Sequence, residues 1–339
     1  MSLDSDAAPL DCANIIKKLQ GNVLMTEFKA ADVYAAACDA KAGISSHIAR
    51  TPLIASRVEP QLFFKAEQFQ KTGSFKLRGA FSKLLSLNED QPVITASSGN
   101  HGLACSYAAQ KTGHNLTVVL PEHVSPSKKA KIEAFGTKII LHEGDSGKAE
   151  EYARRLSGEQ AHIYVSPYND PAIIAGQATI GLDIIEVLPE VATVYVSLGG
   201  GGLISGIGSV LKHLEPSVRV VGVSATHSAA LAASIRAGRV VETEHLDTWA
   251  DGCAGGVDED AITLGIATEV IDQLIECSEA EIENALKDLA WRENMLVEGA
   301  AALAYAGYKA DTGRNKEEPS VVLLCGGNFD IEKMRGLIA

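Results

Sequence analysis

The chain has 339 residues, of which 46% are apolar and 22% charged, a composition typical of an ordinary globular protein that folds in water. This length allows two domains, each with a substantial core. The formal net charge of −13 argues against nucleic acid or an anionic membrane as a partner.

Cysteine usage and hydropathy predict a cytoplasmic protein. Six cysteines, at positions 12, 38, 105, 253, 277 and 325, form no C-x-x-C pair and no metal-ligand spacing, which indicates free thiols in a reducing compartment. No apolar run approaches the length of a membrane span, and the N-terminus lacks the basic and then apolar pattern of a signal peptide.

The chain begins with a stretch of about 28 residues that carries little pattern, apart from a basic apolar patch at 15–19, and we assign it no chemistry. The alanine-rich run Ala30–Ala42 predicts a helix that packs on the larger domain. Thr51-Pro52-Leu53 then turns the chain into the first strands, and the apolar run Leu62–Phe64 predicts a buried strand.

The stretch Gln70–Gly79 places a lysine at the start of a helix. Gly73 and Ser74 are turn and helix-start residues, so Lys76 is expected in the first turn of a helix that continues through apolar positions at 80–85. A cation at a helix N-terminus opposes the macrodipole, which lowers the pKa of the amine and favours its neutral, nucleophilic form. A surface lysine on an ordinary helix is the alternative.

Strands and helices alternate from about residue 88 to 167. Such units predict a parallel sheet with helices on both faces, and we interpret 89–167 as a small domain inserted into a large one that comprises 1–88 and 168–339. The expected strands are Val93–Ala96, Leu116–Leu120, Lys138–Leu141 and Ile163–Val165, and the expected helices are Leu103–Gln110, Pro126–Phe135 and Lys148–Leu156.

A polar stretch, Ser97-Ser98-Gly99-Asn100-His101-Gly102, follows the first of these strands and precedes a helix. Hydroxyls, an amide and exposed N–H groups at a helix start form a site for a carboxylate. A histidine such as His101 is by itself more often structural, and that alternative stays open.

Four consecutive glycines, Gly199-Gly200-Gly201-Gly202, stand between the expected strand Thr193–Leu198 and an expected helix that starts near Leu203. Unobstructed N–H groups at a positive helix end form a phosphate cradle. The stretch has neither the Gly-Lys-Ser/Thr ending of a P-loop nor the dinucleotide-binding glycine pattern, so a small monophosphate is the better ligand. A flexible turn is the alternative.

The large domain resumes after residue 167 with the same alternation. Two doubly wound parallel-sheet domains are therefore expected to face each other across a cleft, where the strand ends carry the site. The further expected helices are Ala172–Val187, Ala229–Ala237, Glu279–Arg292 and Gly299–Tyr308, and the further expected strands are Arg219–Val223 and Val321–Leu324.

A reactive lysine, a monophosphate cradle and a carboxylate cradle together describe pyridoxal phosphate (PLP) that holds an amino acid. From Thr51-Pro52-Leu53 to Cys325-Gly326-Gly327-Asn328, the chain resembles the fold-type II, tryptophan synthase β-like PLP enzymes, in the branch of threonine dehydratases and serine racemases. The lysine stretch followed by the tetraglycine stretch is the most specific part of this resemblance. It implies an α/β fold with PLP in the cleft between the domains, and a homodimer.

The resemblance also implies roles for individual residues. Lys76 is the Schiff-base lysine and, once the substrate has freed it, takes the Cα proton. Phe75 packs near the cofactor ring, although simple core packing explains it equally well. Asn100 contacts the ring hydroxyl of the cofactor, and Glu298 lies near its ring. The cofactor phosphate is held by Gly199, Gly200, Gly201 and Gly202. The side of the site that receives the substrate carboxylate is lined by Ser97, Ser98, Gly99, Asn100 and His101. For Glu298, capping of its helix is the alternative.

Cys325 bears on the type of reaction. By resemblance it stands where the family usually has a serine that faces the pyridine nitrogen. A thiol is a weak neutral donor and does not protonate that nitrogen as an aspartate would, so the ring is a poorer electron sink and prompt β-elimination is favoured over transamination. A buried, inert cysteine is the alternative.

Two features bear on racemisation. Ser98 stands where serine racemases have the serine that works on the opposite face of Cα, although dehydratases use the same serine as a carboxylate ligand. Ser166 and Tyr168 replace the histidine and asparagine expected in racemases. A bulky Tyr168 near the pocket alters the choice of substrate side chain, which argues against serine racemase and leaves the substrate open.

No metal site is expected. Relatives with a divalent-cation site carry an acidic residue soon after the strand equivalent to Arg219–Val223, whereas 222–230 contains no carboxylate here. The spacing and the glycines around Asp251, Asp258 and Asp260 favour a turn over a metal-binding loop.

The leading functional hypothesis is an ammonia-lyase that removes water from L-threonine, L-serine or a related β-hydroxy amino acid and yields a 2-oxo acid and ammonia. Because no regulatory domain is expected after the last strand, a degradative role fits best. The alternatives are an amino acid racemase, a dehydratase of hydroxyaspartate or of a hydroxyectoine breakdown product, and, from another class, a non-catalytic amino-acid-binding protein. A cysteine-synthase-like replacement enzyme does not fit the residues that flank Lys76.

Overall fold

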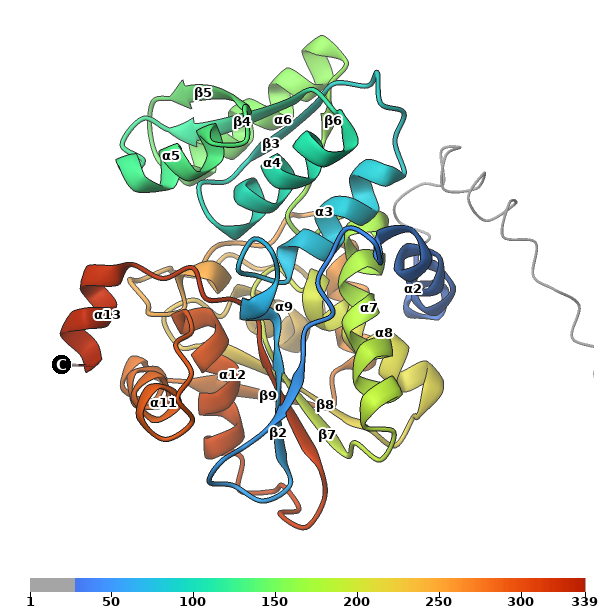
Figure 1. The fold of residues 1–339 in the computed structure, drawn as a ribbon, viewed down its shortest axis with the longest axis vertical. Coiled ribbons are helices and arrows are strands. Elements are labelled where there is room, and N and C mark those ends of the chain that lie inside the picture. Colours follow the sequence, from blue (N-terminus) through green and yellow to red (C-terminus); the bar gives the residue numbers. More distant parts are fainter. Residues whose placement is uncertain (1–27, 339) are drawn as a thin grey trace, which may run out of the picture.

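The computed structural model describes residues 28–338 and contains two separate β-sheets (Figure 1). The basic apolar patch at 15–19 and Cys12 lie outside the described residues. The larger sheet has the strand order β1-β2-β10-β7-β8-β9, and all neighbours are parallel except β1, which pairs antiparallel with β2. Its strands are β1 (Leu53–Ala55), β2 (Leu62–Ala66), β7 (Thr193–Ser197), β8 (Arg219–Ala225), β9 (Gln273–Cys277) and β10 (Ser320–Leu324).

Helices cover both faces of the larger sheet. Strands β7 and β10 are buried at every position, which explains why they read as continuous apolar runs rather than as alternating ones. Helices α11 and α12 lie on one face, whereas α7 and α8 lie on the other with α2 and α10 packed outside them (Figure 1). The helices are α2 (Ala30–Ile44), α7 (Pro171–Val187), α8 (Gly202–Leu214), α9 (Ala230–Ala237), α10 (Ile262–Val270), α11 (Glu279–Trp291), α12 (Gly299–Ala310) and α13 (Ile331–Ile338), with the 3-10 helices η2 (Glu67–Phe69) and η3 (Asp251–Cys253).

The smaller sheet is entirely parallel and has the order β5-β4-β3-β6. Helix α6 packs on one face, and α4 covers the other together with α5, which explains why successive residues of β3, Val93 and Ile94, enter different core clusters. The elements are β3 (Val93–Ala96), β4 (Leu116–Pro121), β5 (Lys138–His142), β6 (Ile163–Tyr164), α4 (Asn100–Thr112), α5 (Pro126–Glu133) and α6 (Ser146–Gln160).

Helix α3 (Lys76–Leu85) connects the two halves of the molecule, because it packs against α4 on one side and against α7 on the other (Figure 1). The expected fold class is confirmed, with the antiparallel β1 as an edge exception. All strands of the smaller sheet come from 89–167, but the exact domain boundaries stay a prediction.

Several elements were not expected from the sequence. These are helix α10, strand β9 and helix α13. Helix α10 carries β-branched residues and a glycine, which are weak helix formers, and it is stabilised by packing on α8. No helix within 28–338 is both long and apolar enough to cross a membrane.

Candidate active site

One cavity, of about 890 Å³, lies where the carboxyl ends of strands from both sheets face each other. Every site residue expected from the sequence lines it, although the residues come from distant parts of the chain. The lining includes Phe75, Lys76, Ser97, Ser98, Gly99, Asn100, His101, Tyr168, Gly199, Gly200, Gly201, Gly202, Glu298 and Cys325.

Lys76 is the first residue of α3, and its amine lies inside the cavity. Nζ donates a hydrogen bond to the carbonyl oxygen of Pro167 at 2.7 Å and lies 5.2 Å from the centre of the Phe75 ring. Burial lowers the pKa of Lys76 to about 8. The lowered pKa agrees with the expectation from the sequence, but its largest cause is burial rather than the helix end. Lys76 is therefore not a surface lysine.

The lysine segment is fixed against the end of strand β10. The backbone N–H of Phe75 donates to the carbonyl oxygen of Cys325 at 3.0 Å, and that of Gly327 donates to the carbonyl oxygen of Gly73 at 2.8 Å. These bonds hold the lysine and Cys325 in a fixed register. The two residues are therefore presented to one cavity although 249 positions separate them in the sequence numbering.

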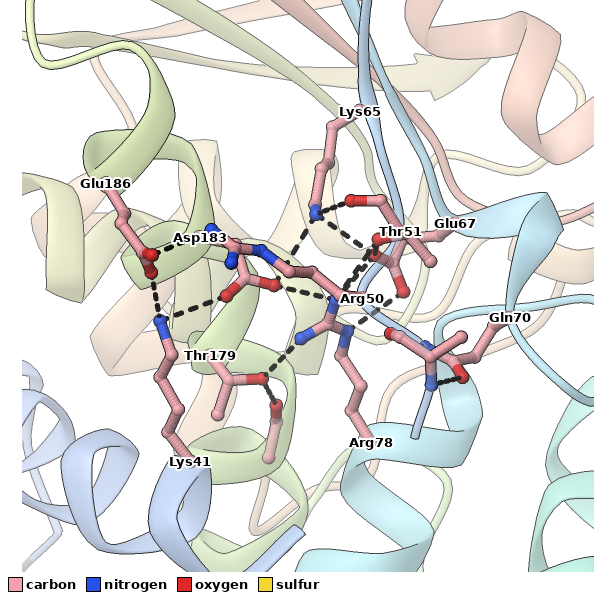
Figure 2. Close-up of polar contacts among 12 residues, drawn as sticks. Lys41, Arg50, Thr51, Lys65, Glu67, Gln70, Arg78, Thr179, Asp183 and Glu186 are labelled. Carbon is pink, nitrogen blue, oxygen red and sulfur yellow. Dashed lines mark hydrogen bonds and ion pairs between the residues drawn. The ribbon is translucent and has the colours of Figure 1, made fainter. Parts of the chain in front are cut away.

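Two residues beyond Lys76, Arg78 forms a buried charge cluster, the Arg78 cluster, with Glu67, Asp183, Lys65 and Thr179 (Figure 2). Its Nε and Nη2 donate to the two Glu67 oxygens at 2.9 and 2.8 Å, and Nη2 also lies 2.8 Å from Asp183 Oδ2. Nη1 donates to Thr179 Oγ1 at 3.0 Å. The cluster ties α3 to strand β2, helix η2 and helix α7.

The tetraglycine stretch is required sterically, and it leaves backbone donors free. A Cβ on Gly200 would lie 2.5 Å from ring carbons of Tyr168, and Gly201 has a φ of +88°, a backbone conformation that favours glycine. Among the backbone hydrogen bonds of the described residues, none is donated by the N–H groups of Gly199, Gly200 or Gly201. These N–H groups stand at the N-terminus of α8, as an anion site requires.

Glu298 lies at the centre of a polar cluster in the cavity wall. Nδ2 of Asn100 donates to its two carboxylate oxygens at 2.8 and 3.0 Å, and the backbone N–H of Asn328 donates at 3.1 Å. The carboxylate makes no capping bond to α12, so helix capping does not explain it. Burial raises the pKa of Glu298 to about 7, although the bonds from Asn100 and Asn328 oppose this shift.

Asn328 was not among the site residues expected from the sequence. Its amide donates to Asn100 Oδ1 at 2.7 Å and to the carbonyl oxygen of Thr72 at 2.8 Å, and so links Asn100 to the lysine segment. A signal was present, because Asn328 is a polar residue just after the last strand, as the other site residues are after theirs.

Two thiols belong to the cavity lining. Sγ of Cys325 lies 3.9 Å from Glu298 Oε1, and burial raises the pKa of Cys325 well above its ordinary value, so this residue stays a neutral thiol. Cys253, which the sequence did not point to, packs its backbone against Gly199, and burial raises the pKa of its thiol to about 12. Cys253 is thus a neutral, apolar part of the wall.

The Ser97–His101 stretch joins β3 to α4. Ser97 Oγ accepts a hydrogen bond from the N–H of Gly99 at 3.2 Å. Nε2 of His101 lies 3.0 Å from the carbonyl oxygen of Val165, and burial lowers the pKa of the imidazole to about 3. The ring is therefore neutral and engaged with the protein interior, as the alternative of a structural histidine expects.

Of the three aspartates considered for a metal loop, two share a hydrogen-bond donor and one does not. Asp251 begins η3, whereas Asp258 and Asp260 each accept a hydrogen bond at 3.2 Å from the side-chain amide of Asn169. Within the described residues, no group of three or more His, Cys, Asp or Glu side chains is arranged to hold a metal ion. The expectation that no divalent-cation site exists stays a prediction.

The fold and the cavity define a class of enzyme. Residues 44–326 match the model of the family described as pyridoxal-phosphate dependent enzyme, so the chain belongs to this family, as its sequence motifs predicted. The catabolic L-threonine dehydratase TdcB of Staphylococcus aureus is 38% identical over 312 residues, which cover 88% of this chain and 90% of that protein.

Solved structures of similar proteins have the same fold. The processed form of threonine deaminase isoform 2 from Solanum lycopersicum superposes with a TM-score of 0.84 at 28% identity, covering 92% of this chain and 94% of that one. Maize serine racemase superposes with a TM-score of 0.82 at 29% identity, covering 89% of this chain and 95% of that one.

The residues present fit PLP. The cavity offers an amine of lowered pKa to an aldehyde and free backbone N–H groups at a helix end to a phosphate. The same cavity is lined by the neutral thiol of Cys325 and by the Asn100–Glu298 pair, which suit the polar edge of a pyridine ring.

Proposed function

We propose that the protein is a PLP-dependent ammonia-lyase that removes water from L-threonine, L-serine or a related β-hydroxy amino acid and releases a 2-oxo acid and ammonia. The observation that carries this proposal is the pairing of the Lys76 amine with the neutral Cys325 thiol in one cavity. The similarity to the Staphylococcus aureus threonine dehydratase over most of the chain supports it.

Lys76 supplies the proton chemistry. PLP, when bound, supplies an electron sink for the carbon from which the proton is removed. An amine with a pKa near 8 is partly neutral at physiological pH, so Lys76 can bind an aldehyde and, when free, accept a proton from Cα. The N–H groups of Gly199–Gly202 would hold the phosphate, with Ser97, Ser98 and Gly99 placed to receive the substrate carboxylate from the other side of the cavity.

Cys325 and Glu298 govern the chemistry once the proton has left Cα. A thiol whose pKa is raised far above its usual value does not donate a full proton to a ring nitrogen, which disfavours transamination and favours loss of the β-hydroxyl group. Glu298 accepts hydrogen bonds from the Asn100 side chain and the Asn328 backbone, and so fixes the Asn100 amide, which would hold the ring hydroxyl of a bound cofactor. The His101 side chain is engaged with Val165, so we assign His101 a part in carboxylate binding only through its backbone.

An amino acid racemase is the second candidate. Ser98 lines the cavity with a hydroxyl that makes no hydrogen bond among the described residues, and maize serine racemase is a structural neighbour. Racemisation needs an acid on the face of Cα opposite Lys76, and Ser98 comes from the opposite sheet.

The test is the release of 2-oxo acid by the PLP-loaded protein with L-threonine, L-serine, D-serine and L-threo-3-hydroxyaspartate, each with and without EDTA. We expect strong release from at least one substrate, unchanged by EDTA. Interconversion of L- and D-serine without 2-oxo acid would instead select the racemase, and binding without any conversion would contradict both. A cytoplasmic location and a homodimer stay predictions, the latter to be measured by light scattering.

A further inference from the structure

A single ion pair joins the two halves of the molecule beside the cavity. Nη2 of Arg154 on α6 lies 2.8 Å from Oδ2 of Asp258, which stands in the segment between η3 and α10. Among the residues that the structure describes, it is the one ion pair between 89–167 and the rest of the chain. Glu150 and Asp258 line the cavity, so the pair stands at its edge.

The guanidinium of Arg154 is held in one orientation from its own side. Its Nε and Nη2 donate to Oε1 of Glu150 at 3.2 and 2.9 Å, and its carbon Cζ lies 4.5 Å from the centre of the Tyr164 ring. The Tyr164 hydroxyl donates to the same Glu150 oxygen at 2.9 Å. Arg154 therefore presents Nη2 to Asp258 from a fixed platform rather than as a free surface side chain.

Asp258 connects this platform to the cavity wall. Its backbone N–H donates to the hydroxyl oxygen of Tyr168 at 2.8 Å, and its Oδ2 accepts from Nδ2 of Asn169 at 3.2 Å. Oδ1 of Asn169 in turn accepts from the N–H of Ile262 at 3.0 Å. Asp258, the last residue of the cavity-lining segment 255–258, is thus pinned to Tyr168. Tyr168 and the segment 255–258 together form a surface that we call the Tyr168 wall.

The Tyr168 wall faces the reacting groups. Tyr168 follows Pro167, the residue whose carbonyl oxygen holds the Lys76 amine, and its ring lies against Gly200 of the phosphate cradle. Tyr168 and 255–258 all line the cavity. A small displacement of this wall changes the space beside the carbon that Lys76 would deprotonate.

We propose that Arg154 is a positioning residue that, through Asp258, sets the Tyr168 wall and thereby the size of amino acid side chain that the cavity accepts. The inference rests on the proposed function for the class of ligand, an amino acid bound to PLP. The ion pair is partly exposed, at 37% for Arg154 and 20% for Asp258, so its loss loosens the wall without unfolding the protein.

The test compares ligands that bind but lack a leaving group on Cβ. L-alanine and L-2-aminobutyrate have the carbon skeletons of serine and threonine, and their dissociation constants for the PLP-loaded protein are measured by the change in cofactor absorbance. Arg154→Met keeps a long side chain over Tyr164 but loses the ion pair. In this variant we expect the ratio of the two constants to change by roughly threefold or more. The two ligands differ by one methyl group, and a well-defined pocket distinguishes ligands that differ by this much.

Matched variants separate positioning from general damage. Arg155→Met removes the same charge from the neighbouring position of α6, whose guanidinium lies over the Tyr152 ring and makes no ion pair with the other half, and it is expected to leave the ratio unchanged. Arg154→Lys, which keeps the charge, is expected to give a ratio between that of Arg154→Met and that of the parent protein. The double variant Arg154→Met with Asp258→Asn is expected to change the ratio no more than either single variant does, because both substitutions break the same ion pair.

A second readout needs no ligand. Hydrogen exchange at the amides of Asp258 and Ile262 in the PLP-loaded protein is expected to be faster in Arg154→Met but not in Arg155→Met. An unchanged ligand ratio in Arg154→Met, with or without faster exchange, would overturn the proposal. If the ratio shifts while no β-hydroxy amino acid is converted, the wall inference stands and only the proposed reaction fails.

Discussion

Two cations on the same helix, the half-buried Lys76 and the buried Arg78, have opposite surroundings. Burial alone would lower the pKa of Arg78, but the Glu67 and Asp183 carboxylates outweigh it and raise the pKa. Lys76 has no carboxylate within ion-pair distance among the described residues, so burial dominates and lowers its pKa to about 8. A buried cation with charged partners is a structural element, whereas one without them is held ready to react.

The largest effect is expected at Lys76. Lys76→Ala removes the amine that we propose both binds the cofactor and accepts the Cα proton, so we expect lyase activity to fall at least about 10³-fold. The measurement is 2-oxo acid release at saturating substrate. The thermal midpoint of the cofactor-free protein is expected to stay within a few degrees, because the Arg78 cluster remains intact. Residual activity within tenfold of the parent protein would contradict the assignment of Lys76.

The next effect is expected at Arg78 and falls on stability. Arg78→Met leaves the buried Glu67 without its main partner and the half-buried Asp183 with only Lys41 and Lys65, so we expect a loss of about 3–5 kcal/mol in the free energy of unfolding. Urea denaturation of the cofactor-free protein measures it. Thr179→Val is the matched control, because it removes two hydrogen bonds but no charge and is expected to cost about 1–2 kcal/mol. Equal losses in the two variants would mean that charge pairing is not the interaction that stabilises this cluster.

A smaller, pH-dependent effect is expected at Glu298. Its folded pKa of about 7 lies above the ordinary value of 4.5, so the folded state binds the proton more tightly than the unfolded state does. The parent protein therefore loses stability as pH rises from about 4.5 to about 7, by an amount on the order of 3 kcal/mol. Glu298→Gln is expected to remove this slope. Urea midpoints at pH 5, 6, 7 and 8 compare the two proteins, and Glu283→Gln, which changes a half-exposed glutamate outside the cavity lining, is the control. A slope that persists in Glu298→Gln would show that another group carries it.

The sequence located the site better than it located the supports of the site. In parallel sheets, side chains that follow strand ends meet at one edge, which is why the sequence alone assigns the residues around Lys76, Ser98, Gly200 and Cys325 to one cleft. Their local patterns, a glycine run or a polar run between strand and helix, were sufficient.

The partners of Arg78 and Arg154 could not be found in this way. Arg78 contacts Asp183, and Arg154 contacts Asp258, each about 100 positions away, and nothing in a single sequence encodes which of many acids pairs with which base. Helix α10 and strand β9 were missed for a related reason, because packing on α8 and pairing with β8 outweigh weak local preferences. The cause of the lowered Lys76 pKa was also misjudged, since burial is a property of the assembled cleft.

The contact between the Tyr168 ring and Gly200 has a consequence for anyone who would redesign this enzyme. A ring that packs against Gly200, in the proposed phosphate site, and also lines the cavity couples cofactor binding to the shape of the cavity, two properties that are usually tuned separately. Replacing Tyr168 to admit a larger substrate would remove the support of the glycine backbone, so gains in substrate range should be accompanied by faster cofactor loss. In a library that varies Tyr168 alone, the variants that accept the largest substrates would therefore also lose the cofactor fastest. Joint variation of Tyr168 and Gly200 would let a new side chain at position 200 fill the space that the ring leaves.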